Sequence, residues 1–252
     1  MKVDINSDLG ESFGNYKMGN DEEVMKYITS ANIACGFHAG DPIVMEHTIK
    51  LALENNVAIG AHPAYPDLMG FGRRSMNLSP KEIKAYVLYQ VGALKAMTEA
   101  MGGKLQHVKA HGALYNDAAV NKSISTAIVE AVYAIDPELI FIGLANSEML
   151  EVAKKLGLNT ASEVFADRAY IKSGTLVSRT LPGSIIHDSD ICNERVLRMI
   201  KEESVKGIDG SDIKIKAESI CIHGDNPAAL DMAKSLKNHL EINGITIQAL
   251  KA

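Results

Sequence analysis

Apolar and polar residues alternate over several short stretches of the chain. The alternation runs over Lys2–Asp8 and again over Asn32–His38, and a period of two is typical of β-strands. Both stretches end in ionisable side chains. The same kind of pattern predicts further strands at Val57–His62, Gln106–Gly112, Leu139–Ala145, a stretch that ends in Glu163–Arg168, Ser219–His223 and Gly244–Leu250.

Segments with a helical period lie between these strands. Asp41 precedes Pro42 as a helix N-cap, and Ser79–Glu82 has the pattern of a capping box. Residues 63–78 and 169–187 are too long and too rich in glycine and proline for plain connections. The predicted helices are a short one capped by Asn20, then Pro42–Asn56, Pro80–Met101, Asp117–Ile135, Ser147–Leu156, Asp188–Lys206 and Pro227–Asn243.

Strands that alternate with helices seven or eight times predict an α/β fold with a parallel sheet. The chain has 252 residues, which favours a closed (β/α) barrel over a doubly wound sheet. We therefore expect one barrel domain over residues 1–252.

Composition limits the classes of partner. The formal net charge is −5, and there is no cluster of lysine and arginine, which argues against nucleic acid and acidic membranes as partners. Small molecules or proteins remain. Three cysteines, an odd number, fit a reducing compartment, and neither a leader-like apolar run nor eighteen consecutive apolar residues occurs. These features predict a cytoplasmic protein.

Several predicted strands carry one apolar face and one polar face. If the apolar faces contact the outer helices, the polar faces line the barrel interior and its carboxyl-terminal mouth, where barrel enzymes place their chemistry. Burying so many polar groups costs a few kcal/mol each unless they are paired. A functional site explains them better than a structural core. The polar positions are Asp4, Asn6, Asp8, Asn32, His38, His62, His223 and Asp225.

Each candidate also has a structural interpretation. A lone histidine at a strand end, such as His38 or His62, is often only a satisfied core residue, and Asp8 and Glu11 could be turn formers. Asp167 and Arg168 could form a structural ion pair. Further candidates are His107, Lys109 and His111 on one strand face, Asp225 beside a helix start, and Arg73 and Arg74, which suit a carboxylate or phosphate.

The candidate residues permit two kinds of chemistry. Histidines and aspartates at strand ends could hold a divalent metal, with Asp8, His38, His62 and His111 as candidate ligands, or could act without metal as acids and bases. Lys109 would stabilise an oxyanion in either case. No zinc-protease, P-loop, dinucleotide or nucleophile-elbow motif occurs. Hydrolysis of an amide in a small polar substrate fits both kinds.

Eight short stretches spread over nearly the whole chain form one distinctive set of motifs: Asp4–Gly14, Ala31–Pro42, Gly60–Pro63, Pro66–Asp67, Gly70–Arg74, His111–Asn116, Phe165–Arg168 and Cys221–Asp225. Together they resemble the LamB/YcsF family, the A subunits of prokaryotic 5-oxoprolinase. The departures are small, and Ser7, where the family usually has cysteine, argues against a required thiol there.

The resemblance implies a seven-stranded (β/α) barrel related to polysaccharide deacetylases. It also implies action with B and C subunits to convert 5-oxo-L-proline, ATP and water to L-glutamate, ADP and phosphate. The missing P-loop favours the partner subunits as the place where ATP binds. The expected catalytic residues are Asp8, His38, His62, Lys109, His111, His223 and Asp225, and the expected substrate-binding residues are Asn6, Glu11, Arg73, Arg74, Asp167 and Arg168.

Two other functions remain open at this point. The chain could be a metal-dependent deacetylase or amidohydrolase that needs no ATP. It could also be a non-catalytic binding subunit of a lactam-utilising complex.

Overall fold

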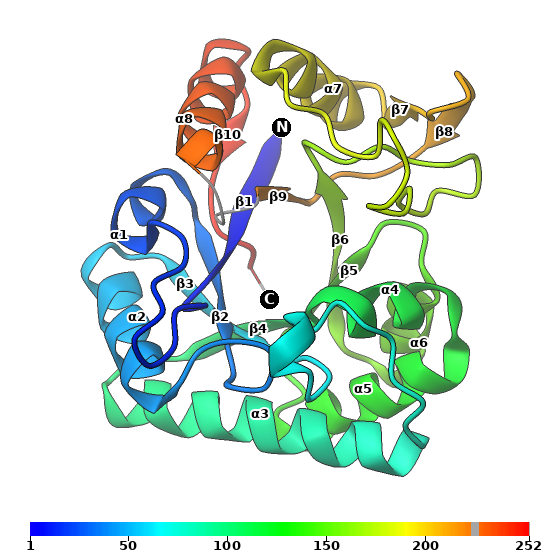
Figure 1. Ribbon diagram of the computed structural model, residues 1–252. Coiled ribbons are helices and arrows are strands. Elements are labelled where there is room, and N and C mark those ends of the chain that lie inside the picture. Colours follow the sequence, from blue (N-terminus) through cyan, green and yellow to red (C-terminus); the bar gives the residue numbers. More distant parts are fainter. Residues whose placement is uncertain (223–226, 252) are drawn as a thin grey trace.

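Seven parallel strands close into a barrel, which confirms the predicted fold class (Figure 1). The computed structural model describes residues 1–222 and 227–251. Each strand pairs with the next around the ring, and the last pairs back to the first. In ring order the strands are β1 (Lys2–Leu9), β2 (Ser30–Ala34), β3 (Ala58–His62), β4 (Leu105–Lys109), β5 (Ile140–Leu144), β6 (Asn159–Phe165) and β9 (Ser219–Ile222).

Helices surround the ring, and the starts of α2 and α3 follow the predicted signals. Asp41 accepts hydrogen bonds from the backbone amides of Ile43 and Val44, and Ser79 forms a complete capping box with Glu82. Among the described residues, no helix has the length and apolar character that a membrane crossing needs. The helices are α1 (Asp21–Val24), η1 (Met25–Tyr27), α2 (Pro42–Glu54), η2 (Leu68–Gly70), α3 (Pro80–Ala100), α4 (Gly112–Val120), α5 (Lys122–Ile135), α6 (Glu148–Leu156), α7 (Ser189–Lys201) and α8 (Pro227–Ile242).

Two predicted helices have the wrong extent. The helix predicted over Asp117–Ile135 is two helices, because Asn121 has an extended backbone (φ −122°, ψ 106°) and its side chain caps α5. The helix predicted to reach Lys206 ends at Lys201. Beyond it, β7 (Ser204–Lys206) and β8 (Asp212–Lys214) form an antiparallel hairpin that the pattern did not predict.

Smaller differences occur at strand ends and caps. The strand predicted to reach His38 ends at Ala34, and a turn follows in which the amide of Gly36 bonds to the carbonyl of Ala39. Asn20 precedes α1 but makes no capping bond with its side chain. The last predicted strand is short: β10 (Thr246–Ile247) pairs with the start of β1 outside the ring.

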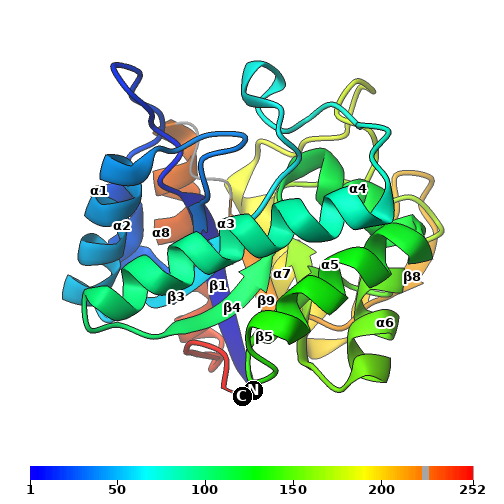
Figure 2. The same ribbon diagram turned by 90° about the horizontal axis from the view of Figure 1, so that it is seen from below.

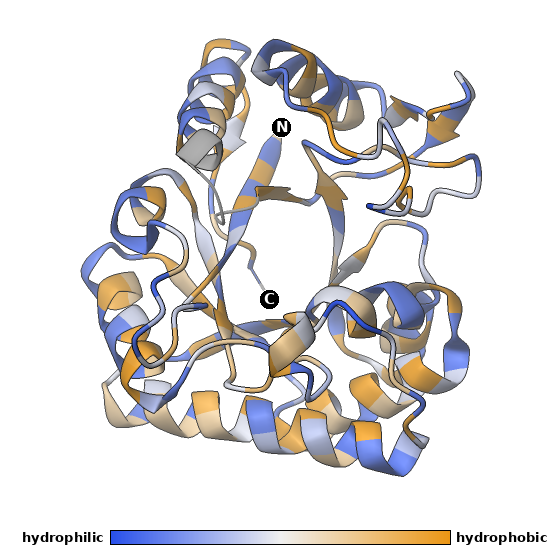
Figure 3. Ribbon diagram, in the orientation of Figure 1, coloured by the Kyte–Doolittle hydropathy of each residue, from blue (hydrophilic) through white to orange (hydrophobic). Residues whose placement is uncertain are grey.

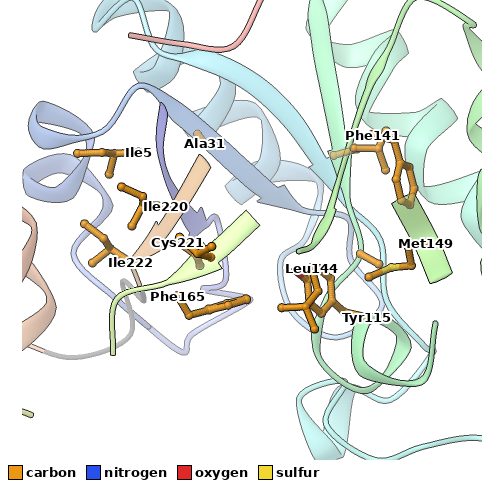
Figure 4. Packing of buried hydrophobic residues seen from close by; sticks show 14 of the residues in the cluster. Ile5, Ala31, Tyr115, Phe141, Leu144, Met149, Phe165, Ile220, Cys221 and Ile222 are labelled. Atoms are coloured by element: carbon orange, nitrogen blue, oxygen red, sulfur yellow. The ribbon is translucent and has the colours of Figure 1, made fainter. Parts of the chain in front are cut away.

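The two faces of the strands have the predicted characters. Hydrophobic and hydrophilic residues alternate along β1 in Figure 3. Figure 4 shows Ile220 and Ile222 on one side of β9 and Cys221 on the other. All three residues belong to the buried core, and Cys221 also accepts a bond from the ammonium of Lys109 inside the barrel. The apolar faces therefore pack outwards and the polar faces lie inside the barrel.

Three long connections rise from the carboxyl ends of the strands. In Figure 2 residues 10–20, 63–79 and 166–188 extend from the end of the barrel opposite the two termini. Parallel strands deliver their carboxyl ends to one edge, so these connections surround the same mouth.

The interior packing predicts that Gly60→Ala will destabilise the fold. A Cβ at Gly60 would meet Nε2 of His107 at 1.9 Å, and that imidazole is held by Asn32 at 2.9 Å. We expect the free energy of unfolding to fall by about 2 kcal/mol or more in urea titrations. The control is Gly92→Ala in α3, where nothing lies within 4 Å of the added Cβ. There we expect a gain of up to about 1 kcal/mol, and equal effects would contradict the prediction.

Candidate functional site

A cavity of about 570 Å³ opens at the carboxyl end of the barrel. Its walls come from strand ends, from helix α4 and from the connections at 63–79 and 166–188. The volume is within the range of about 300–1,000 Å³ that is usual for small-molecule sites. The predicted site residues that line it are Asp8, Glu11, His62, Arg73, Lys109, His111 and Arg168.

Four buried side chains gather their ligand atoms on one side of this cavity. Glu11 follows β1, His38 follows β2, His62 ends β3 and His111 follows β4, and one ligand atom from each lies within 4.8 Å of the others. Oε1 of Glu11 is 3.2 Å from Nε2 of His38 and 3.8 Å from Nδ1 of His111. The carboxylate in this cluster is therefore Glu11, while Asp8 lies beside it, 3.2 Å from Nε2 of His62.

Backbone carbonyls fix the orientation of two of the imidazoles. Nδ1 of His62 donates to the carbonyl of Lys109 at 2.8 Å, and Nε2 of His111 donates to the carbonyl of Phe71 at 2.9 Å. A carbonyl only accepts, so in the neutral form each ring turns its lone pair to the other side. These two nitrogens, Nε2 of His62 and Nδ1 of His111, are 3.0 Å apart. Two lone pairs at this distance repel unless a proton or a metal cation lies between them.

Glycines let the connection at 63–79 pack against the histidines. Gly72 has φ +63°, and a Cβ there would lie 2.7 Å from the ring of His111 and 2.8 Å from His38. Gly112 has φ +56°, and a Cβ there would lie 2.5 Å from the carbonyl oxygen of Gly72. Only glycine allows this approach. The rings of His38 and His111 then stack, with centroids 3.7 Å apart.

A second cluster is built around the ammonium of Lys109 inside the barrel. Nζ of Lys109 is 2.9 Å from Oδ1 of Asp8 and 2.9 Å from Oε1 of Glu163, and it donates to Oδ1 of Asn6 at 3.1 Å. The hydroxyl of Tyr115 donates to the other oxygen of Glu163 at 2.5 Å. Strands β1, β4 and β6 thus meet at one buried cation.

Burial and neighbouring charges set the protonation of these groups. Burial opposes ionisation of Asp8, but the charges of His62 and Lys109 outweigh it and hold the pKa of Asp8 well below its usual value. Burial also opposes the charge on Lys109, yet Asp8 and the other anionic neighbours raise its pKa well above the usual value. Burial, with the neighbouring histidines, lowers the pKa of His38 and of His111 well below the usual value. At neutral pH both imidazoles are therefore uncharged, which is the form that ligates metals.

Carboxylates outnumber the lysine ammonium within the described residues of the two clusters. Asp8 and Glu163 pair with Lys109, whereas the carboxylate of Glu11 faces His38 and His111. A divalent cation among Glu11 and the three histidines would meet one carboxylate oxygen and three imidazole nitrogens.

Other predicted residues have different surroundings. Arg74 pairs with the buried carboxylate of Asp67 in the connection at 63–79. Arg168 lines the cavity, but its guanidinium donates to the carbonyl of Val177. The carbonyl of Asp167 accepts a bond from Ile186. His107 lies deeper in the barrel, and burial lowers its pKa to about 3. The predicted positions His223 and Asp225 lie outside the described residues.

Three residues of this site are not among the predicted ones. Glu163 stands directly before the apolar pair Val164 and Phe165 at the end of its strand, and Tyr115 lies within the motif His111–Asn116, so these positions are the signals that could have found them. Arg179 lines the cavity from a connection without periodic pattern, so nothing in the sequence singled it out.

Comparison with known sequences gives matches along the whole chain. The model of the LamB/YcsF family matches residues 3–252. The 5-oxoprolinase A subunit of Alkaliphilus metalliredigens is 60% identical over 99% of this chain and 98% of its own length. The protein of the same name from Pyrococcus abyssi is 55% identical over 100% of this chain and 98% of its own length.

Solved structures are similar as well. The crystal structure of a lactam utilization protein from Thermus thermophilus has a TM-score of 0.94 and 45% identity, over 99% of this chain and 100% of that one. The catalytic domain of a peptidoglycan N-acetylglucosamine deacetylase from Eubacterium rectale has a TM-score of 0.51 and 9% identity, over 99% of this chain and 88% of that one. At this identity the second likeness shows the fold alone, and it agrees with the expected deacetylase-type barrel.

The buried ion pairs of Lys109 predict that loss of its ammonium will strongly destabilise the fold. Lys109→Met leaves the carboxylates of Asp8 and Glu163 without their ammonium, and we expect the free energy of unfolding to fall by about 3–5 kcal/mol. Adding Glu163→Gln removes one of the two carboxylates and should recover part of the loss. Lys104→Met, at an exposed position, is the control and should change the free energy of unfolding by less than about 0.5 kcal/mol. Urea unfolding measures all three variants, and equal effects at the two lysines would contradict the prediction.

Proposed function

Because the chain belongs to the LamB/YcsF family, we propose that it is the A subunit of a 5-oxoprolinase and opens the ring of 5-oxo-L-proline to L-glutamate. The observation that carries the proposal is one cavity that holds both an ionised carboxylate, Asp8, and a buried ammonium, Lys109. The names of the relatives support the substrate. Hydrolysis of a cyclic amide needs both a proton acceptor and a group that stabilises negative charge.

The residues suit distinct tasks in this reaction. Asp8 is ionised and lines the cavity, and we assign to it the acceptance of a proton from water. Asp8, Glu163 and Asn6 fix the position of the Lys109 ammonium, and we assign to it the stabilisation of an oxyanion that develops on the lactam carbonyl. Arg73 lines the same cavity and suits the carboxylate of the substrate. These assignments account for one proton acceptor, one oxyanion partner and one anchor.

We propose in addition that Glu11, His38, His62 and His111 hold a divalent metal. Three imidazoles with one carboxylate are a donor set that suits zinc and similar transition metals. The carbonyls that orient His62 and His111 resemble the outer partners that usually accompany metal-bound histidines. When bound, such an ion supplies Lewis-acid polarisation of a carbonyl or phosphoryl oxygen.

ATP enters this proposal through the partner B and C subunits. A five-membered lactam resists hydrolysis, and phosphorylation of its amide oxygen by ATP, which releases ADP, activates the carbonyl carbon. Water then adds to this carbon, the C–N bond breaks with the ring nitrogen leaving as the protonated amine, and hydrolysis of the resulting acyl phosphate releases phosphate and L-glutamate. We assign ATP binding and this phosphorylation to the partners, and hydrolysis to the cavity of this chain.

The described cysteines are buried free thiols, which supports a cytoplasmic location.

The histidine cluster also favours a second candidate function. A metal-dependent amidohydrolase acting without ATP would use the same Glu11 and histidines. The two candidates differ in whether the isolated chain turns over its substrate. A third candidate, a non-catalytic binding subunit, differs from both in tolerating loss of Asp8.

The metal proposal predicts one divalent ion for each chain. After dialysis against zinc and removal of the excess, elemental analysis should find about one equivalent, and the melting temperature should rise with added zinc. His62→Ala should weaken the affinity at least about 10-fold because it removes a ligand. His47→Ala on the exposed face of α2 is the control and should leave the affinity unchanged. Substoichiometric zinc, or equal affinity in the His62 variant, would contradict the site.

The activity proposal is tested with the complex reconstituted from this chain and purified B and C subunits. ATP-dependent formation of glutamate should fall about 10²- to 10⁴-fold in Asp8→Asn with the complex still assembled, since the proton acceptor is lost. Glu46→Gln, an exposed carboxylate on α2, should keep full activity. Full turnover in Asp8→Asn would identify a binding subunit. Turnover by the isolated chain without ATP would instead identify the amidohydrolase.

A further inference from the structure

Three arginines from two separate connections line the cavity that contains Asp8 and Lys109. Arg73 comes from residues 63–79, and Arg168 and Arg179 come from residues 166–188, the segment drawn in yellow-green that rises beside the mouth in Figure 2. Arg73 lies over the ring of Phe71, 4.9 Å from its centroid. The guanidinium groups therefore reach one space from different parts of the chain.

The buried Arg168 fastens the connection that carries Arg179. Its guanidinium donates to the carbonyl of Val177 at 2.6 Å, and its own carbonyl accepts from Arg195 at 2.8 Å. The amide of Val177 also bonds to the carbonyl of Ala169. Residues 175–180, which form part of the cavity wall, are thus tied to the barrel through Arg168.

Arg179 lies in a turn closed by a bond from the amide of Leu181 to the carbonyl of Ser178 at 3.0 Å. On either side of it, the hydroxyls of Ser178 and Thr180 are 2.9 Å apart, and both residues line the cavity. The turn therefore presents one guanidinium and two hydroxyl groups at the cavity. These are groups that bind carboxylates and phosphates.

The three arginines concentrate positive charge at this wall of the cavity. Burial is the main cause that lowers the pKa of Arg168 to about 10, and the charges of Arg179 and Arg73 act in the same direction, which shows that the three groups are close enough to interact. An anionic ligand at this wall would be attracted by the arginines, whereas a neutral ligand would not.

We propose that Arg73 and Arg179 form an anion subsite that selects lactams bearing a carboxylate or a phosphoryl group, and that Arg168 is the positioning residue that holds Arg179 in place. This inference rests on the proposed function and deepens it by naming the group that the site recognises. The cavity volume of about 570 Å³ accommodates a lactam together with such a group. Selection then depends on the anion, while the reaction depends on Asp8 and Lys109.

The test compares two lactams that differ only in the carboxylate, 5-oxo-L-proline and 2-pyrrolidinone. Titration calorimetry measures the affinity for each lactam. Arg179→Gln should weaken the affinity for 5-oxo-L-proline about 10- to 100-fold, the loss expected for a charge-assisted hydrogen bond, and should leave the affinity for 2-pyrrolidinone unchanged. Arg179→Lys should recover part of the affinity. Lys172→Gln is the matched control, because it removes one positive charge from an exposed position of the same connection, and it should affect neither lactam.

Inorganic phosphate distinguishes the two sources of the anion. If Arg179→Gln lowers the affinity for phosphate more than the affinity for 5-oxo-L-proline, the subsite receives a phosphoryl group. If it lowers the affinity for 5-oxo-L-proline more, the subsite receives the carboxylate. No change for either anion overturns the subsite. If the wild-type chain binds neither lactam, the proposed function fails, and the loss or retention of phosphate affinity in Arg179→Gln then decides the subsite by itself.

The positioning role of Arg168 needs a readout of the connection itself. Arg168→Lys keeps the charge but loses the planar fork that reaches Val177, so hydrogen exchange of the amides at 175–180 should become faster together with a weaker affinity for 5-oxo-L-proline. Arg179→Gln should weaken the same affinity without changing the exchange. Unchanged exchange in Arg168→Lys would overturn the positioning role.

Discussion

The ammonium of Lys109 inside the barrel is the charge around which the site is organised. An isolated charge at this depth would be costly, and carboxylates from two other strands, Asp8 on β1 and Glu163 on β6, compensate it. The same contacts determine where each carboxylate lies. Because Lys109 holds one oxygen of Asp8, the other oxygen turns towards Nε2 of His62. The position of the proton acceptor beside the histidine cluster thus follows from satisfying one buried cation.

The histidine cluster depends on a different constraint, the direction of two backbone carbonyls. His62 and His111 each give their N–H to a carbonyl, so their remaining nitrogens converge with Glu11 on one point. A strand end and a glycine-rich connection supply these carbonyls, and both are closely packed. This arrangement brings the two imidazole nitrogens to 3.0 Å from one another beside the carboxylate of Glu11. A bound divalent cation would accept the lone pairs of both nitrogens, which is why we favour a metal centre over a purely acid and base site.

The repeating strand and helix pattern was sufficient to predict the barrel and the end of it that carries the polar residues. It could not locate contacts that exist only after ring closure. Glu163 meets Lys109 across 54 positions of sequence, and each residue alone looks like a polar interruption of a strand. The alternation up to His38 had another cause than strand pairing, because Phe37 packs against Tyr86 and Tyr89 of α3. Asn121 fits the helical period but breaks the helix, since its side chain caps the next one.

The two parts of the cavity differ in how they are supported, and this difference bears on function. Asp8, His62 and Lys109 lie on strands whose ladder bonds hold them in register, so the chemical groups keep their distances. Arg73 and Arg179 lie on connections held by a few turns and by glycine contacts. If the partners deliver an activated lactam, the ligand that enters is larger than the lactam that initially binds the complex. The cavity of about 570 Å³ meets that requirement, because it leaves room at the mouth for the larger anion while the groups that act on the ring stay fixed by the strands.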